Sequence, residues 1–349
     1  MAKSLYVHIP FCQKICPYCA FVRQLYHQEK VDKYLSLLKK IINTKYKNNK
    51  FKTIYIGGGT PNCLTTKQLT KLLGCLVNKL LPKYEFTIEC NPELVSKQQI
   101  KIFKQYKVNR ISLGMQTLNE KILKSINRSH NRYHLKQAIK LFKKNKINNL
   151  SCDLIYGFNH QSITTIKNDL DFLIKNKINH ISCYCLEIKP KTVFAKKNYK
   201  LNEIESEKQL KFIIEYLKQK KFSRYEVSNW CKANKDKSYH NILVWKSNEW
   251  VGIGWGAHGF EKNIYYHYEG SILKWKLVKK KLTKKELYQQ VLIMGLRLEK
   301  GLNLNNKLVN ESYNFFKKEL NSSSLFIKTK KTIKCRNINL LNCLLEKII

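Results

Sequence analysis

Long hydrophobic runs are absent from this sequence of 349 residues. No apolar stretch reaches the roughly 18 residues that a membrane-spanning helix needs. The N-terminal residues also lack the continuous apolar segment of a secretory signal peptide. Hydrophobic residues nevertheless make up 43% of the chain, which is typical of a globular rather than a disordered protein. We therefore expect a globular protein with a cytoplasmic location.

Acidic residues are scarce: 24 Asp and Glu stand against 66 Lys and Arg, which leaves a net charge of +42. Such an excess is typical of proteins that bind nucleic acid or anionic membranes, but it also results from a general compositional bias. The lysines are spread along the whole chain, and no basic motif with interleaved aromatic residues is present. We favour compositional bias, expect no specific nucleic-acid partner, and leave open a weak association with anionic membrane surfaces.

Internal repeats of the solenoid kind are also absent. Instead, strand-like and helix-like segments alternate through the first half of the chain. The predicted strands are Ser4–Ile9, Thr53–Ile56, Glu85–Glu89, Arg110–Met115, Leu150–Ile155 and His180–Glu187. The predicted helices between them are Val31–Lys45, Thr66–Leu80, Ser96–Tyr106, Tyr133–Lys144 and Thr164–Lys175.

Helical connections of this length predict a parallel sheet, and right-handed crossovers would curl it into a full or partial barrel. We predict an α/β fold with three parts. Residues 1–220 form the barrel, and residues 221–281 form an extension with shorter strands and many glycines. Residues 282–349 have helical periodicity and form a separate C-terminal domain.

Twelve cysteines in a cytoplasmic chain do not predict disulfides, because that compartment keeps thiols reduced. Nine are scattered, mostly in apolar contexts, whereas Cys12, Cys16 and Cys19 cluster directly after the first predicted strand. Thiolates are the ligands of iron–sulfur clusters, and three of them leave one iron of a [4Fe–4S] cluster without a protein ligand. A zinc site with His8 or His27 as a further ligand, and chance clustering, are the alternatives. We favour the cluster.

Two runs of residues carry a family resemblance: Tyr6-Val7-His8-Ile9-Pro10-Phe11-Cys12 and Cys16-Pro17-Tyr18-Cys19. They resemble the coproporphyrinogen-dehydrogenase-like branch of the radical S-adenosylmethionine (SAM) superfamily, and within it the HemW-type heme chaperones. The resemblance extends at least to Gly301. It implies a radical SAM partial (β/α)6 TIM-like barrel with a C-terminal helical, winged-helix-like domain. It also implies a [4Fe–4S] cluster whose open iron binds SAM.

The resemblance extends to the loops that follow the predicted strands. Gly57-Gly58-Gly59-Thr60-Pro61 is similar to the family's methionine-binding loop, where glycines let the main chain approach the ligand. Asn127 stands where the family has Gly before an arginine, and Asn tolerates the same left-handed conformation. The resemblance implies that the cofactor is bound by Tyr6, Tyr18, Gly58, Gly59, Thr60, Glu89, Gln116, Arg128 and Asp153, with metal ligands Cys12, Cys16 and Cys19.

A later motif, His240-Asn241-x-x-Val244-Trp245, resembles the His-Asn-x-x-Tyr-Trp motif of the family's chaperone members, whose histidine is implicated in heme binding. Val244 replaces the tyrosine of that motif. Imidazole is a good axial ligand of heme iron, but a single histidine is as often a hydrogen-bonded structural residue. Both interpretations of His240 stay open here.

Two features distinguish this chain from the family's oxidase. Phe21 stands where coproporphyrinogen dehydrogenases carry a further cysteine, and the first predicted strand begins without the oxidase's N-terminal extension. We predict a HemW-like chaperone that binds the cluster, SAM and heme and transfers heme to apo-hemoproteins. The alternatives are an oxygen-independent coproporphyrinogen III dehydrogenase and a radical SAM methyltransferase acting on nucleic acid. Enzymatic activity, catalytic residues, the heme acceptor and a homodimer are left open.

Overall fold

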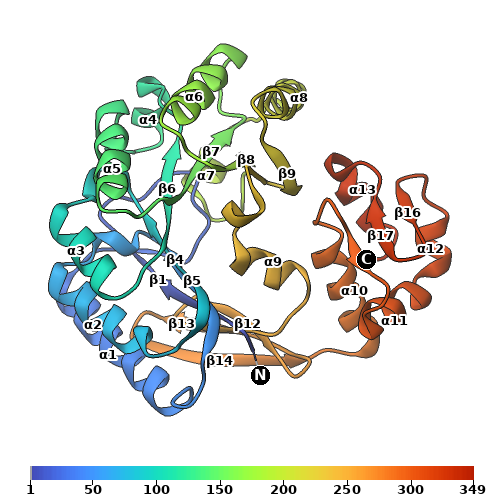
Figure 1. Cartoon of the computed structure of the whole chain (residues 1–349), viewed down its shortest axis with the longest axis horizontal. Coiled ribbons are helices and arrows are strands. Elements are labelled where there is room, and N and C mark those ends of the chain that lie inside the picture. The colour runs from blue at the N-terminus through green and yellow to red at the C-terminus, as the bar shows by residue number, and fades with distance from the viewer. Residues whose placement is uncertain (1) are drawn as a thin grey trace.

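A 12-stranded sheet organises the computed structural model of this chain, which describes residues 2–349 (Figure 1). Met1, the first residue of the predicted barrel, lies outside the described residues. The strand order is β14-β13-β12-β11-β1-β4-β5-β6-β7-β8-β10-β9. The six central strands, all parallel, confirm the six that the sequence predicts: β1 (Ser4–Ile9), β4 (Phe51–Gly58), β5 (Leu80–Cys90), β6 (Arg110–Gln116), β7 (Asn149–Tyr156) and β8 (His180–Cys185).

Side chains alternate between the two faces of each strand, as the two-residue period of a strand requires. In β1, Leu5, Val7 and Ile9 are fully buried in the main apolar core. Tyr6 and His8 lie on the opposite face, where the side chains of the curled sheet meet one another. The polar residues that could form a site therefore gather on the inner face of the sheet.

Helices cover the outer face of the sheet (Figure 1). Each buries one apolar stripe; in α1 the buried residues include Leu35, Leu38 and Ile42. Capping fixes where several begin: Thr65 and Gln68 form a reciprocal capping box at the start of α2. The helices are α1 (Gln28–Thr44), α2 (Thr66–Val77), α3 (Lys97–Gln105), α4 (Glu120–Ser125), α5 (Arg132–Lys144), α6 (Ile163–Lys175), α7 (Val193–Lys196) and α8 (Glu203–Gln219).

The segment after α8 forms both edges of the sheet, which the sequence does not predict. One edge carries the antiparallel pair β9 (Ser223–Glu226) and β10 (Asn229–Cys231) beside β8. The chain then crosses over through α9 (Tyr239–Trp245), and β11 (Trp250–Ile253) joins β1 as a further parallel neighbour. The antiparallel strands β12 (His258–Glu261), β13 (Ile264–Ser271) and β14 (Lys274–Lys281) follow.

The C-terminal part has an apolar core of its own, built around residues such as Leu292, Tyr313 and Leu344. It is not helical throughout, because it also contains a three-stranded sheet of order β15-β17-β16. Its elements are α10 (Lys284–Gly295), β15 (Leu302–Asn303), α11 (Lys307–Phe315), α12 (Lys317–Asn321), β16 (Phe326–Lys328), β17 (Thr332–Cys335) and α13 (Leu341–Leu345). The boundaries 220/221 and 281/282 stay predictions. None of the helices that residues 2–349 form is long and apolar enough to cross a bilayer.

Candidate functional site

A cavity of about 450 Å³ opens where the carboxyl ends of the central strands meet the loop after β1. Carboxyl ends of parallel strands are the usual location of active sites in barrels of this kind. Most of the predicted site residues line the cavity: Cys12, Cys16, Tyr18, Cys19, Gly58, Gly59, Thr60, Glu89, Gln116, Arg128 and Asp153. Two do not, Tyr6 and His240.

The three clustered cysteines all face this cavity. Cys12 ends the short strand β2 (Phe11–Cys12), which pairs with β3 (Gln24–Leu25) and thereby closes the loop that carries Cys16 and Cys19. Burial raises the pKa of the Cys12 thiol to about 11 and also raises that of Cys19, each with a contribution from the neighbouring cysteines. A cationic metal would reverse that cost, because bound thiols lose their proton. Among residues 2–349, no three His, Cys, Asp or Glu side chains are arranged to hold a single metal ion.

Each glycine of the Gly57-Gly58-Gly59 loop lies against a different neighbour. A Cβ on Gly57 would lie 2.8 Å from Glu89 Oε1, and one on Gly58 would lie 2.7 Å from the His8 ring. A Cβ on Gly59 would lie 2.9 Å from Cys12 Sγ. Gly58 also has a φ of +117°, a conformation that side chains disfavour. The glycines therefore let this loop pack closely against Glu89, His8 and Cys12, while its predicted role in binding methionine stays a prediction.

Two partly buried carboxyl groups, Glu89 and Asp153, border the cavity from β5 and β7. Glu89 accepts hydrogen bonds from the Tyr55 hydroxyl at 2.9 Å and from Gly58 N–H at 3.1 Å. Burial, followed by the charge of Asp153, raises the pKa of Glu89 to about 7. Burial also raises the pKa of Asp153, although Ser112 donates a hydrogen bond to it. A cationic ligand would offset this unfavourable pairing of carboxylates.

Arg128 and Gln116 converge on Gly114 near the end of β6. Arg128 Nη2 donates to the Gly114 carbonyl, and a Cβ on Gly114 would lie 2.8 Å from Nη2 and 3.2 Å from Gln116 Nε2. Gln116 has a φ of +62°, where the register of β6 and β7 shifts. Asn127 has a φ of +59°, which confirms the left-handed conformation predicted for it.

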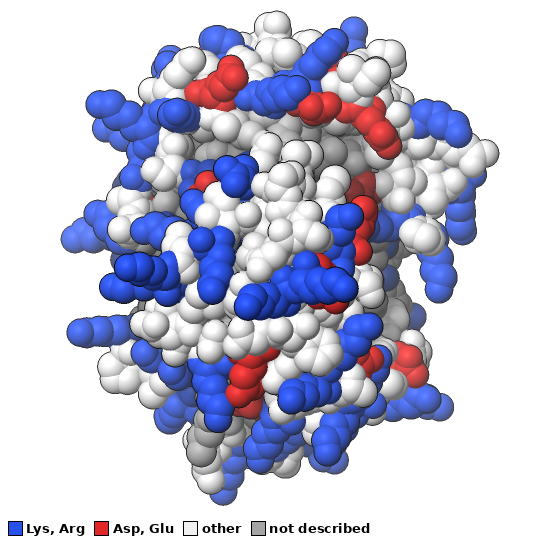
Figure 2. All heavy atoms as spheres, turned by 90° about the vertical axis from the view of Figure 1, so that its right-hand side faces the viewer, with Lys and Arg blue, Asp and Glu red and all other residues white. Residues whose placement is uncertain are grey.

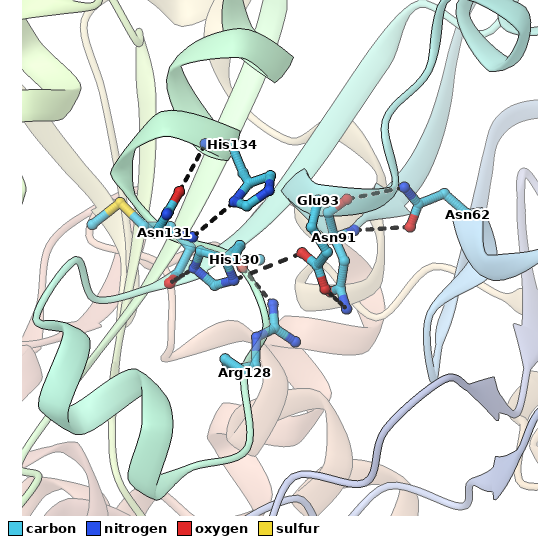
Figure 3. A network of polar contacts seen from close by, with 9 residues as sticks. Asn62, Asn91, Glu93, Arg128, His130, Asn131 and His134 are labelled. Carbon is cyan, nitrogen blue, oxygen red and sulfur yellow. Dashed lines mark hydrogen bonds and ion pairs between the residues drawn. The ribbon is translucent and has the colours of Figure 1, made fainter.

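A polar network lies behind Arg128 and the end of β6 (Figure 3). The Asn62 side-chain amide donates to the Asn91 carbonyl at 3.0 Å and accepts from the Asn91 N–H at 2.8 Å. His130 is hydrogen-bonded through Nε2 to the Met115 carbonyl, and its Nδ1 lies 3.8 Å from Glu93 Oε2. Burial lowers the pKa of His130 to about 3, so its ring is neutral. The network anchors the loops that carry the cavity-lining side chains.

Tyr6 and His240 occupy the inside of the sheet instead of the cavity. Tyr6 is hydrogen-bonded to His8 at 3.0 Å and lies against Tyr55. The His240 ring, on α9, is hydrogen-bonded through Nδ1 to Thr53 Oγ1 at 2.9 Å. Burial lowers the pKa of His240 to about 3. In this conformation the imidazole has no access to the cavity at the cysteines, and its role as a heme ligand stays a prediction.

Several cavity residues were not predicted from the sequence as site residues. The strand residues among them could have been predicted, because the alternation of side chains that places Glu89 and Asp153 on the inner face also places them there. The others come from loops whose course the sequence does not specify. The additional lining residues include Phe21, Tyr55, Asn91, Ser112, Ile155, Cys185, Leu186 and Lys189.

These residues fit a [4Fe–4S] cluster with SAM, by their chemistry. Three thiols face one cavity together with two carboxyls whose pKa values are raised, which suits a ligand with a sulfonium and an ammonium group. Gln116 Oε1 and Arg128 Nε are buried without a hydrogen-bond partner, which leaves one acceptor and one donor for a bound ligand. Tyr55, Ser112 and Asn91 add further polar groups around the same space.

Comparison with known proteins identifies relatives of this chain. The family model of the radical SAM superfamily matches residues 6–173. The protein "Heme chaperone HemW" of Lactococcus lactis is 34% identical over 315 residues, which cover 86% of this chain and 83% of that protein. "Heme chaperone HemW" of Bacillus subtilis is 34% identical over 269 residues, which cover 74% and 71%.

Among solved structures, the coproporphyrinogen III oxidase HemN of Escherichia coli, a radical SAM enzyme, superimposes with a TM-score of 0.84. The match covers 99% of this chain and 89% of that chain at 18% identity. The TM-score shows that the two proteins share a fold. Together with the family match, this likeness confirms the predicted radical SAM α/β fold.

Proposed function

Because this chain belongs to the HemW family within the radical SAM superfamily, we propose that it is a heme chaperone, which binds heme and transfers it to apo-hemoproteins in the cytoplasm. The observation that carries this proposal is the identity of 34% with a relative named as a heme chaperone, over 83% of that relative's length. Association with anionic membranes and formation of a homodimer stay predictions.

The family implies a [4Fe–4S] cluster and SAM. In our proposal Cys12, Cys16 and Cys19 hold the cluster, which supplies an electron and an open iron for SAM when it is bound. The chain's own residues then bind and orient SAM. Glu89 attracts its cationic groups, and Arg128 pairs with its carboxylate.

The cluster assignment is tested by anaerobic reconstitution with iron and sulfide. We expect wild-type protein to retain about four irons and four sulfides per chain, as a [4Fe–4S] cluster contains. The triple variant Cys12→Ala, Cys16→Ala, Cys19→Ala should retain neither. The triple variant Cys75→Ala, Cys335→Ala, Cys343→Ala is the matched control, because none of these cysteines lines the cavity. Equal iron content in wild type and in the first variant would reject the assignment.

The chaperone proposal is tested by heme titration and transfer. Wild-type protein should bind heme with a defined stoichiometry and then pass it to an apo-hemoprotein, which gains the spectrum of its holo form. His240→Ala belongs in the same titration, because an axial ligand would be lost with it. An unchanged spectrum and affinity would reject His240 as the ligand while leaving heme binding intact.

The shared fold with coproporphyrinogen III oxidase favours a second candidate function, oxidative decarboxylation of coproporphyrinogen III. Phe21 argues against it: this side chain is 66% exposed at the rim of the cavity, at the position where the oxidases carry a cysteine. An anaerobic assay with SAM, a reductant and coproporphyrinogen III decides between the two. We expect no decarboxylated product, and its formation would replace the chaperone proposal.

A further inference from the structure

A second, larger hollow of about 980 Å³ lies between the sheet and the C-terminal part, away from the cysteines. We call it the interdomain groove. One side is formed by β9, the loop after β10 and α9. The other side is formed by the turn after α10, β15 and the start of α11. Figure 1 shows α9 on the side of the barrel that faces the C-terminal part.

Main-chain pairing holds the two sides of the interdomain groove together. Val227 N–H donates to the Arg297 carbonyl at 3.1 Å, and Glu299 N–H donates to the Tyr225 carbonyl at 3.1 Å. The bridge between Glu226 and Leu298 lies between these bonds. Main-chain pairing therefore joins the edge strand of the barrel to the C-terminal part at the bottom of the interdomain groove.

The lining combines cations with apolar surface. The apolar residues include Tyr225, Ile242, Leu298, Leu302 and Val309. The lining cations are Arg224, Lys232, Lys237, Lys246 and Lys300, with Glu299 as the single acidic lining residue.

The cations do not pair with carboxylates. Arg224 is engaged with the Val227 carbonyl and with Asn339. Lys237 lies over the Tyr225 ring with its Nζ 5.5 Å from the centroid. The ion pairs of residues 2–349 include none of these lysines. Figure 2, which faces the C-terminal part, shows that Lys and Arg outnumber acidic side chains over this surface.

We propose that the interdomain groove is the heme-binding site. Heme is a large flat apolar ring with two carboxylates on one edge, and the groove offers apolar walls with unpaired ammonium groups at the rim. Its volume lies at the upper end of the range for small-molecule sites. The proposal rests on the proposed function, because that function makes heme the ligand to be accommodated.

The interdomain groove and the cysteine cavity lie at opposite ends of the same strand. Cys231, which lines the groove, is paired with His180 at the start of β8, whereas Cys185 at its end lines the cavity. Five residue steps of about 3.3 Å separate the two ends by roughly 16 Å. Heme in the groove would therefore lie outside the cavity in which SAM binds, as suits a cargo rather than a substrate.

His240 acquires a different role under this proposal. Ile242 and Lys246 of α9 line the groove, while the His240 ring on the same helix is held by Thr53 inside the barrel. Glu85 accepts hydrogen bonds from the main-chain N–H groups of Tyr239 and His240 at 2.8 Å and 2.9 Å. His240 is thus a positioning residue that fixes α9, the wall of the groove.

Heme titrations of the whole chain test the proposal, with absorbance as the readout. The variant Lys237→Glu, Lys246→Glu should weaken heme binding about tenfold or more. The variant Lys101→Glu, Lys140→Glu changes the net charge equally on exposed faces of α3 and α5, and it should bind as wild type. The dimethyl ester of heme, which has no carboxylates, should bind wild type and the groove variant alike. His240→Gln should keep the wild-type absorbance spectrum.

Each outcome separates the two proposals. If the groove variant binds heme as tightly as wild type, the groove is not the site and the chaperone proposal stands. If His240→Gln changes the heme spectrum and the groove variant does not, the groove is likewise not the site and the chaperone proposal stands. A wild-type chain that binds no heme rejects both. Should the charge-reversal variant fail to fold, Lys237→Gln with Lys246→Gln removes the same charges and should still weaken binding of heme but not of its ester.

Discussion

Replacement of Glu89 by Gln should make the stability of the apo-protein less dependent on pH. Burial and the neighbouring Asp153 raise the pKa of Glu89 from 4.5 to about 7. A carboxyl group with a raised pKa contributes its full stabilisation below pH 4.5, and that contribution is lost as the pH rises toward 7. The glutamine side chain does not ionise, so the variant lacks this loss.

The size of the effect follows from the same values. The difference between 4.5 and about 7 corresponds to about 3 kcal/mol. Part of this free energy is already lost below pH 5. Solvent in the cavity that the carboxylate borders reduces it further. We therefore expect the free energy of unfolding of Glu89→Gln, relative to wild type, to increase by about 2 kcal/mol between pH 5 and pH 8.

Urea unfolding of both proteins at several pH values measures this quantity, and titrating groups distant from Glu89 cancel in the comparison. Glu207→Gln is the control: this carboxylate is exposed and Lys211 lowers its pKa, so its small change should have the opposite sign. A relative stability of Glu89→Gln that stays constant or falls between pH 5 and pH 8 would refute the raised pKa. Added SAM should reduce the wild-type pH dependence, because its cationic groups favour the ionised carboxylate.

Gly58→Ala should lower the free energy of unfolding by about 1–3 kcal/mol in urea, because its φ is +117° and the added Cβ would lie 2.7 Å from the His8 ring. The control Gly74→Ala lies in α2, where the added Cβ would come no closer than 3.5 Å to Tyr106. It should be neutral or stabilise the protein by about 1 kcal/mol. Arg128→Lys should weaken SAM binding about tenfold in anaerobic equilibrium dialysis without loss of cluster iron, and undiminished binding would remove Arg128 from the site. Leu292→Ala should lower the unfolding free energy by about 2–5 kcal/mol in urea, since the side chain is fully buried in the C-terminal core.

Local patterns were enough to predict the six central strands and most helices between them. Strand alternation, apolar helix stripes and glycine-containing turns are all encoded within a few residues. The left-handed conformation of Asn127 could be predicted because Asn tolerates it, whereas the same conformation at Gln116 and at several lysines could not. What involves distant segments was not predictable: β11 pairs with β1 across nearly the whole barrel sequence, Ser4 with Trp250.

The site shows the same division between local and distant information. Motifs identify the loops after β1, β4, β5 and β6, and the fold brings them to one cavity. Tyr6 belongs to the strongest motif, yet it lies within β1 and contacts His8 and Tyr55 rather than the cavity. The surroundings of His240 depend on how α9 packs against Thr53, which is distant in sequence, so the motif alone could not separate a ligand from a structural histidine.

The cysteine cavity and the interdomain groove lie apart, which would let one fold serve either catalysis or transport of a porphyrin. In this chain the cysteine loop lies at the carboxyl ends of the strands. A porphyrinogen that reacts must enter that cavity, which here measures about 450 Å³ and is bordered by Phe21. A cargo that is only carried has no such requirement, and the larger interdomain groove at the amino end of β8 is available to it. Separation of the two places would let cluster and SAM regulate or assemble the protein without exposing bound heme to radical chemistry.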